Sequence, residues 1–140
     1  MGATAQQLVD DAVARIHHLS PIRVEAHLLA GDAVLVDVRE AVELEEHGWI
    51  AEAVHVPRRL LEFRADPTSP WHRPELDPAR RTIVCCGAGH RSALAVETLV
   101  ALGYREVARL DGGLTAWKRA GIPVAGLCDW HWLDGGHRRA

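Results

Sequence analysis

Hydrophobic residues recur at helical spacing close to the start of the chain. The apolar positions that fall on one helical face are Leu8, Val9, Ala12, Val13 and Ile16. Polar residues such as Asp10 and Arg15 occupy the opposite face, and Thr4 with Gln7 has the spacing of a capping box. This pattern predicts an amphipathic helix within an N-terminal segment, residues 1–19.

A second helix is predicted directly after this segment. Ser20 followed by Pro21 is typical of a helix N-cap and first helical position, and Gly31 is a suitable stop. Further along, an apolar run at 93–102 predicts a helix that ends at Gly103, and residues 114–120 predict another that ends at Gly121.

Short apolar runs alternate with these helical segments. The runs expected to form strands are 33–38, 53–56, 82–86 and 107–110, with a short acidic helix or turn at 40–46 between the first two. Nearly continuous apolar runs are typical of strands buried on both faces of a parallel sheet. The sequence therefore predicts an α/β fold: a mainly parallel central sheet with helices on both faces, plus an extra N-terminal helix.

Two polar residues interrupt the predicted strands. Asp37 is interpreted as a structural acceptor of backbone N–H groups rather than as a catalyst, with Arg39 completing its network. His55 alternates with buried positions and is expected to be a hydrogen-bonded strand histidine rather than a ligand.

The connection from residue 57 to residue 78 contains five prolines and little periodicity. Long irregular connections in small domains are either functional lids or surface excursions, and both interpretations stay open for this segment. The domain proper is expected to span residues 20–125, followed by a loosely docked or disordered tail, 126–140. Cys128, His131 and His137 in that tail are a weak metal-ligand signal, and neither a metal nor a cofactor is expected.

Charge and cysteine content exclude several classes of function. The net charge is −3 over 140 residues, which gives no general attraction for nucleic acid or for an anionic membrane, and no apolar run approaches the length of a membrane span. Three cysteines, two of them adjacent, do not form a disulfide framework. The expected setting is reducing and cytoplasmic, with usable thiols.

The chemistry is expected at residues 82–92, where an apolar strand leads through two cysteines and a glycine-containing loop into a helix. Unpaired N–H groups at a helix start stabilise a thiolate or an oxyanion. Counting from Cys85 to Arg91 gives five intervening residues, the spacing of the phosphate loop of protein tyrosine phosphatases. Counting from Cys86 gives four, a smaller loop that suits one sulfur atom carried on the cysteine. The loop by itself leaves both chemistries open.

The sequence resembles the rhodanese family over about residues 20–124. The matching stretches are Leu35 to Arg39, the loop Cys86 to Ser92, and Leu110 to Val124, which reads LDGGLTAWKRAGIPV. The last stretch is the most specific and has no counterpart in tyrosine phosphatases. The resemblance therefore implies that Cys86 carries a persulfide and that Cys85 belongs to the strand.

The implied function is sulfurtransferase activity, in which Cys86 takes sulfane sulfur from thiosulfate or a persulfide and passes it to cyanide or a thiol. The implied substrate-binding residues are Gly87, Ala88, Gly89, His90, Arg91 and Ser92. Arg91 would orient an anionic donor directly or tie down the loop, and His90 would add charge or be a bystander. Thiosulfate-using members often have arginine after the cysteine, where this chain has Gly87, so a different preferred donor is one interpretation.

The expected partners are a small-molecule sulfur donor, a thiol or cyanide acceptor, and a protein sulfur acceptor as a further candidate. Two alternatives to this function stay open. One is a cysteine-dependent phosphatase or arsenate reductase that uses Cys85. The other is a non-catalytic rhodanese-like module with a binding or regulatory role.

Overall fold

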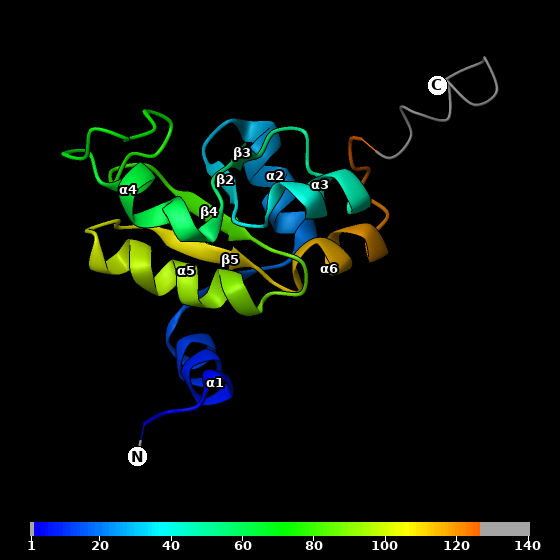
Figure 1. Ribbon diagram of the computed structural model, residues 1–140. Helices are drawn as coiled ribbons and strands as arrows, with labels where there is room; N and C mark the ends of the chain where they lie inside the picture. The colour runs from blue at the N-terminus through cyan, green and yellow to red at the C-terminus, as the bar shows by residue number, and fades with distance from the viewer. Residues whose placement is uncertain (1, 127–140) are drawn as a thin grey trace.

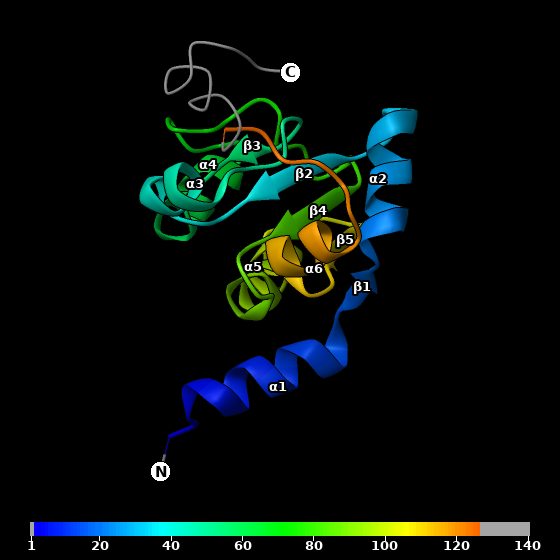
Figure 2. The same ribbon diagram turned by 90° about the vertical axis from the view of Figure 1, so that its right-hand side faces the viewer.

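The computed structural model describes residues 2–126. It contains a sheet with helices on both faces (Figures 1 and 2). The elements in chain order are α1 Ala5–Arg15, β1 His17–Leu19, α2 Pro21–Ala30, β2 Val34–Asp37, α3 Ala41–His47, β3 Val54–His55, the 3-10 turn η1 Arg58–Leu60, α4 Leu61–Ala65, β4 Thr82–Cys85, α5 His90–Ala101, β5 Val107–Leu110 and α6 Gly113–Arg119.

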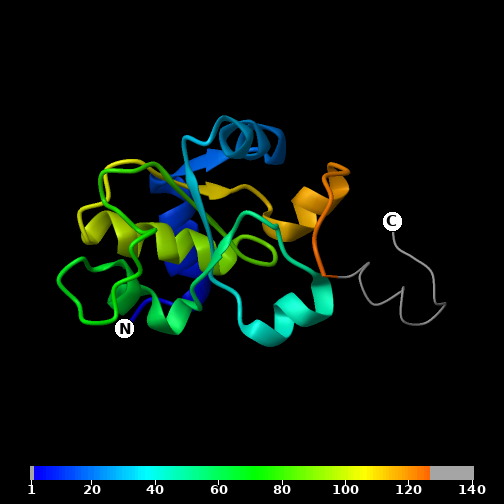
Figure 3. The same ribbon diagram turned by 90° about the horizontal axis from the view of Figure 1, so that it is seen from above.

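The sheet has five strands in the order β1-β5-β4-β2-β3, and every neighbouring pair is parallel. Parallel strands joined by helical crossovers place their carboxyl ends at one edge, which is where ligands of such sheets bind. In Figure 3 the 86–89 loop, α3 and α6 lie toward this edge, while α4 and the segment that follows it lie at the opposite end. The predicted α/β fold is therefore confirmed.

Two apolar clusters cover the two faces of the sheet. Side chains of α4 and α5 pack on one face, and side chains of α2 and α6 pack on the other. The extra helix α1 packs against α5 and ends beside the first cluster, where Ile16 is half-buried. Figure 2 shows α1 below α5, joined to the sheet through β1.

Local sequence signals set several of the helix ends. Thr4 and Gln7 form the capping box, with Thr4 Oγ1 accepting from Gln7 N at 3.0 Å. Ser20 caps α2 ahead of Pro21, and Gly31 ends α2 at a φ of 70°, a left-handed conformation that favours glycine. These three predictions are confirmed.

Strand β1 is the element that the sequence pattern missed. The helix predicted within 1–19 ends at Arg15, and His17–Leu19 then pairs in parallel with β5. Three residues that read His-His-Leu carry no alternation of their own, so only their neighbour β5 reveals the strand.

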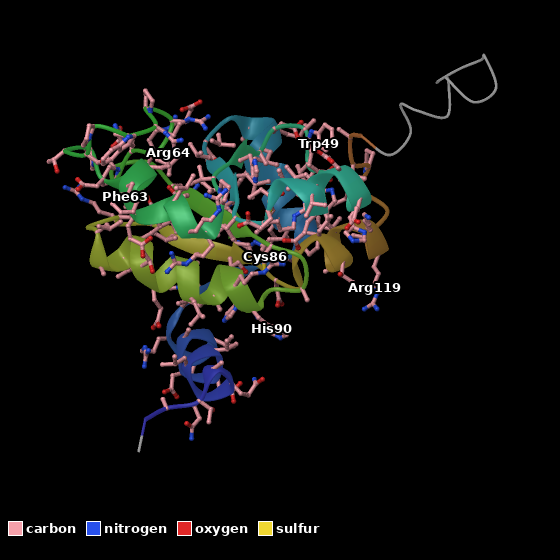
Figure 4. All side chains as sticks on the ribbon, in the orientation of Figure 1. Trp49, Phe63, Arg64, Cys86, His90 and Arg119 are labelled. Atoms are coloured by element: carbon pink, nitrogen blue, oxygen red, sulfur yellow. The ribbon has the colours of Figure 1, made fainter. Side chains whose placement is uncertain are left out.

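The 57–78 connection starts beside the carboxyl end of β2, where Arg58 N donates to the Val38 carbonyl at 3.0 Å, and its later part lies at the end of the sheet where the strands begin. Leu76 is buried, and Tyr104 Oη donates to the carbonyl of Ala65 at 2.7 Å, so part of the segment is anchored to the core. Phe63 and Arg64 lie well away from Cys86 in Figure 4. In this structure the segment is not a lid over the cysteine loop.

Candidate active site

The two adjacent cysteines point to opposite faces of the sheet. Cys85 is the last residue of β4 and belongs to the cluster under α2 and α6, whereas Cys86 belongs to the cluster under α5. Successive side chains of a strand alternate in direction, so two adjacent residues lie in the environments of opposite faces of the sheet. The two thiols therefore have different chemistry.

Cys85 is a core thiol. Its side chain has no exposed surface, and burial raises its pKa well above the usual range, with the carboxylate of Asp37 acting in the same direction. A thiol that burial holds neutral is a poor nucleophile. Cys86 is also buried, at 1% exposed, so the two thiols differ in the groups around the sulfur and not in exposure. This environment matches the predicted structural role of Cys85.

The sulfur of Cys86 is enclosed by its own loop. Cys86 Sγ accepts N–H groups from Gly89 at 3.1 Å and from Ser92 at 3.3 Å. The Ser92 hydroxyl lies 3.5 Å from the sulfur and donates to the Gly89 carbonyl at 3.1 Å. Since α5 begins at His90, its positive dipole end also faces the sulfur. The arrangement stabilises negative charge on Cys86.

The amino end of α6 fixes the carbonyl groups of the same loop. Leu114 N donates to the Cys86 carbonyl at 2.9 Å, and Thr115 N donates to the Gly87 carbonyl at 3.1 Å. The Thr115 hydroxyl donates a second hydrogen bond to the Gly87 carbonyl at 3.2 Å. The motif at 110–124, used above only as a family marker, thus holds the cysteine loop in place. Sequence reasoning had not assigned Leu114 or Thr115 to the site.

Gly113 permits this close contact. It has a φ of 62°, and a Cβ added there would lie 2.5 Å from the Cys86 carbonyl oxygen and 2.7 Å from that of Gly87. Both neighbours are backbone atoms, which cannot swing aside. Glycine is therefore required where α6 meets the loop.

Arg91 is tied to helix α3 rather than free over the loop. Its two terminal nitrogens bind the two carboxylate oxygens of Glu43 at 2.7 and 2.8 Å. The Arg91 hydrogen bonds lower the pKa of Glu43 to about 2, and the Glu43 carboxylate raises the pKa of Arg91. Of the two roles considered for Arg91, tying down the loop fits this geometry.

We expect Glu43→Gln to lower the free energy of unfolding by about 1 kcal/mol at neutral pH, because solvent screens this partly exposed pair. The pKa of Glu43 is lower in the folded chain, about 2 against an ordinary 4.5, so its contribution is complete above pH 4.5 and is lost as pH falls toward 2. Urea titrations across this range should show the difference from the parent shrinking. Glu45→Gln, on the same helix, is the control, and a pH-independent difference for Glu43→Gln would contradict the assignment.

Asp37 and Arg39 form a buried pair beneath the site. Arg39 donates to both Asp37 oxygens, with the shortest contact 2.7 Å from Nη2 to Oδ2, and also to the Gly48 carbonyl at 2.9 Å. Both side chains are 1% exposed. His55 Nε2 lies 2.7 Å from the Arg39 carbonyl oxygen. Arg39 N also donates to Asp37 Oδ1 at 3.0 Å, so Asp37 accepts from the backbone as predicted, and His55 is the predicted hydrogen-bonded strand histidine.

A cavity of about 350 Å³ opens beside the cysteine loop. Its lining residues are Arg39, Glu43, His47, Gly87, Ala88, Arg91, Leu114, Thr115 and Lys118. None of the described residues between 57 and 78 lines it. His90 is exposed and points away from Cys86 in Figure 4.

Lys118 is a cavity residue that sequence reasoning missed. It is exposed on the last turn of α6 and has no ion pair with a carboxylate of residues 2–126. The two arginines of the cavity, Arg39 and Arg91, are each paired with a carboxylate. The only available signal was its place in the 110–124 motif, four residues after Leu114.

Two findings concern metal and membrane binding. Within residues 2–126 no group of three or more His, Cys, Asp or Glu side chains could hold a metal ion. No helix of that part of the chain is both long and apolar enough to cross a membrane. Cys128, His131 and His137 lie outside the described residues.

These features define a class of site: a cysteine at the carboxyl end of a central parallel strand, enclosed by a short loop at the start of a helix. The sequence profile of the rhodanese-like domain matches residues 20–120. The chain belongs to the rhodanese-like family.

Known relatives support this membership. A sulfurtransferase of Allochromatium vinosum is 33% identical over 93 residues, which are 66% of this chain and 78% of that protein. A Rhodopseudomonas palustris protein of unknown function, described as a possible tyrosine phosphatase, superposes with a TM-score of 0.82 at 33% identity, covering 89% of this chain and 96% of that one.

A thiosulfate sulfurtransferase of Pseudomonas aeruginosa superposes with a TM-score of 0.70 at 29% identity. The match covers 86% of this chain but 22% of that one, so the shared part is a single module of a longer protein.

Proposed function

We propose that this protein is a sulfurtransferase that carries sulfane sulfur on Cys86. The observation that supports it most is the enclosure of Cys86 Sγ by the N–H groups of Gly89 and Ser92, in a chain of the rhodanese-like family. A loop with four residues between Cys86 and Arg91 is sized for one added sulfur atom. The relatives named as sulfurtransferases point the same way.

The proposed first step is attack of the Cys86 thiolate on the outer sulfur of a donor. With thiosulfate, the sulfur–sulfur bond of the donor breaks and sulfite leaves with the bonding electron pair. With a thiol persulfide, the leaving group is the corresponding thiolate. Cys86 then carries a persulfide, and the N–H groups of Gly87 and Ala88, at the edge of the cavity, are the candidate donors to its outer sulfur.

In the second step an acceptor nucleophile attacks the outer sulfur of the persulfide. Cyanide yields thiocyanate, a thiol yields a new persulfide, and Cys86 leaves as the thiolate in both cases. This two-step cycle is ping-pong. A protein thiol is a further candidate acceptor. We place the reaction in a reducing, cytoplasmic setting, because the cycle needs Cys86 as a free thiol.

The contacts of the remaining loop residues support a proposed role for each of them. Ser92 and Gly89 hold the inner sulfur, and Arg91 keeps the loop against α3 through Glu43, whereas His90 is exposed and does not line the cavity. Because Arg91 is paired, we assign the recognition of an anionic donor to Lys118.

We expect Lys118→Gln to raise the KM for thiosulfate about fivefold, as an interaction of roughly 1 kcal/mol with an anion is lost, with little change in kcat. Lys118→Arg should stay close to the parent. The control is Arg119→Gln, which removes a neighbouring charge that does not line the cavity. Steady-state kinetics at two salt concentrations make the comparison. An equal rise in KM for both glutamine variants would mean that general surface charge, and not Lys118 in the cavity, binds the donor.

Mass spectrometry tests the proposed function directly. After incubation with thiosulfate or glutathione persulfide, one added sulfur is expected on the peptide that contains Cys86, and cyanide should remove it with formation of thiocyanate. An absence of the adduct with every donor would support a non-catalytic binding or regulatory module. Hydrolysis of phosphate esters or reduction of arsenate through Cys85 is the other alternative, and the raised pKa of that thiol argues against it.

A further inference from the structure

Arg109, on strand β5, contacts the cysteine loop through its side chain. Its side chain is 12% exposed and makes three polar contacts. Nη1 donates to the Gly89 carbonyl at 2.9 Å, Nε donates to His18 Nδ1 at 2.7 Å, and Nη2 donates to Asp111 Oδ1 at 3.2 Å. A buried guanidinium with all its branches engaged has a fixed orientation.

His18 continues this chain of contacts into the N-terminal segment. It lies opposite Arg109 in the register of β1 and β5. Because Nδ1 accepts a hydrogen bond from Arg109, the ring proton lies on Nε2, which is 2.9 Å from the carbonyl oxygen of Val13 in α1. One imidazole thus joins α1 to Arg109.

Gly89 is the last residue in this series of contacts. Its carbonyl accepts from Arg109 while its N–H donates to Cys86 Sγ at 3.1 Å. It has a φ of 110°, and a Cβ there would lie 2.9 Å from Arg109 Nη1, so the close approach of the guanidinium requires glycine. The position of the N–H group that holds the sulfur therefore depends on Arg109.

We infer that His18 and Arg109 are positioning residues for Cys86. Through them the segment α1–β1 helps to orient the loop N–H group that binds the Cys86 sulfur. The path runs from the Val13 carbonyl through His18 and Arg109 to the Gly89 carbonyl, and from the Gly89 N–H to the sulfur. Without His18, the Arg109 guanidinium loses one of its three contacts, and Arg109 holds the Gly89 carbonyl less firmly, while the bond from Ser92 Oγ to that carbonyl remains. For sulfur transfer this inference rests on the proposed function, but the effect on thiol reactivity does not.

The test measures alkylation of Cys86 by iodoacetamide in the full chain, followed by mass spectrometry. The readout is the ratio of the rate at about pH 7 to the rate at about pH 10, on either side of the ordinary titration of a thiol. Because accessibility affects both rates, the ratio reports how well the loop stabilises negative charge on sulfur. We expect the ratio to fall about threefold in His18→Ala and about tenfold in Arg109→Met, sizes typical of a lost charge-assisted hydrogen bond.

Two further variants separate positioning from general stability. His17→Ala changes the neighbouring histidine, which is exposed as His18 is, and should leave the ratio unchanged. His18→Gln keeps one acceptor and one donor and should stay within about twofold of the parent. The inference is overturned if His18→Ala behaves like His17→Ala, if Arg109→Met leaves the ratio unchanged, or if His18→Gln is as impaired as His18→Ala.

Sulfur transfer is measured on the same variants. If the parent chain transfers sulfur, His18→Ala and Arg109→Met should slow loading of Cys86 roughly in proportion to the alkylation ratio. If the parent chain transfers none, the proposed function fails while the alkylation result still decides the role of His18 and Arg109.

Discussion

Cys86→Ser is expected to abolish sulfur transfer, with a loss of at least about a thousandfold, because a serine hydroxyl can neither attack sulfane sulfur at neutral pH nor carry a persulfide. Cys85→Ala should retain the rate within about threefold. Its thiol lies on the other face of the sheet and has no exposed surface. The cost of that change falls on stability, about 1 kcal/mol for a small cavity in the core.

Donor consumption and persulfide loading check this pair of variants together. Loading is followed by mass spectrometry, and unfolding in urea verifies that both variants fold. Full transfer activity in Cys86→Ser would refute the assignment of the nucleophile. Loss of activity in Cys85→Ala, with Cys86 intact and the fold stable, would return the chemistry to Cys85 and to the phosphatase-like alternative.

The separation of the two cysteines was within reach of the sequence because it depends on local rules. Strand parity sends adjacent side chains to opposite faces. The residue count to Arg91 leaves both cysteines open, and the family motif at 110–124 is what favours Cys86. Asp37 and Arg39 were predictable for a similar reason, since they are two residues apart on one strand end and their hydrogen bonds are local.

The contacts that support the loop were not predictable in the same way. Glu43 and Arg91 are 48 positions apart, and His18 and Arg109 are 91 positions apart. No periodicity links such residues, because only the order of strands in the sheet brings them together. Strand β1 illustrates the point: its three residues form a strand only because β5 offers an edge.

The motif at 110–124 was predictable from the sequence only in part. Its residues could be recognised from the sequence, but the reason for its glycines appears only in three dimensions. Gly113 lets the start of α6 approach the loop, so that two helix N–H groups bind the carbonyls of Cys86 and Gly87, whereas a Cβ at Gly112 would meet Ala116 of α6 itself. A motif distant in sequence from the cysteine therefore determines the direction in which the loop N–H groups point.

Gly113→Ala is consequently expected to damage both stability and activity. The new methyl group would lie 2.5 Å from the Cys86 carbonyl oxygen, and the backbone would keep a φ of 62° that alanine disfavours. Overpacking against rigid backbone and the strained φ together should lower the free energy of unfolding by about 3 kcal/mol. If α6 shifts to relieve the contact, its bonds to the loop lengthen, and we expect persulfide loading to slow at least about tenfold.

Gly121→Ala provides the matched control at the other end of the same helix. Gly121 also has a positive φ, 79°, but a Cβ there would meet nothing within 4 Å, so this variant carries the backbone strain alone, about 1 kcal/mol. Urea unfolding and persulfide loading are measured for both variants. Equal losses of stability, or normal loading in Gly113→Ala, would mean that the contact between α6 and the loop does not position Cys86. A larger loss of stability confined to Gly113→Ala, together with slow loading, would establish that this contact holds the cysteine loop in its active shape.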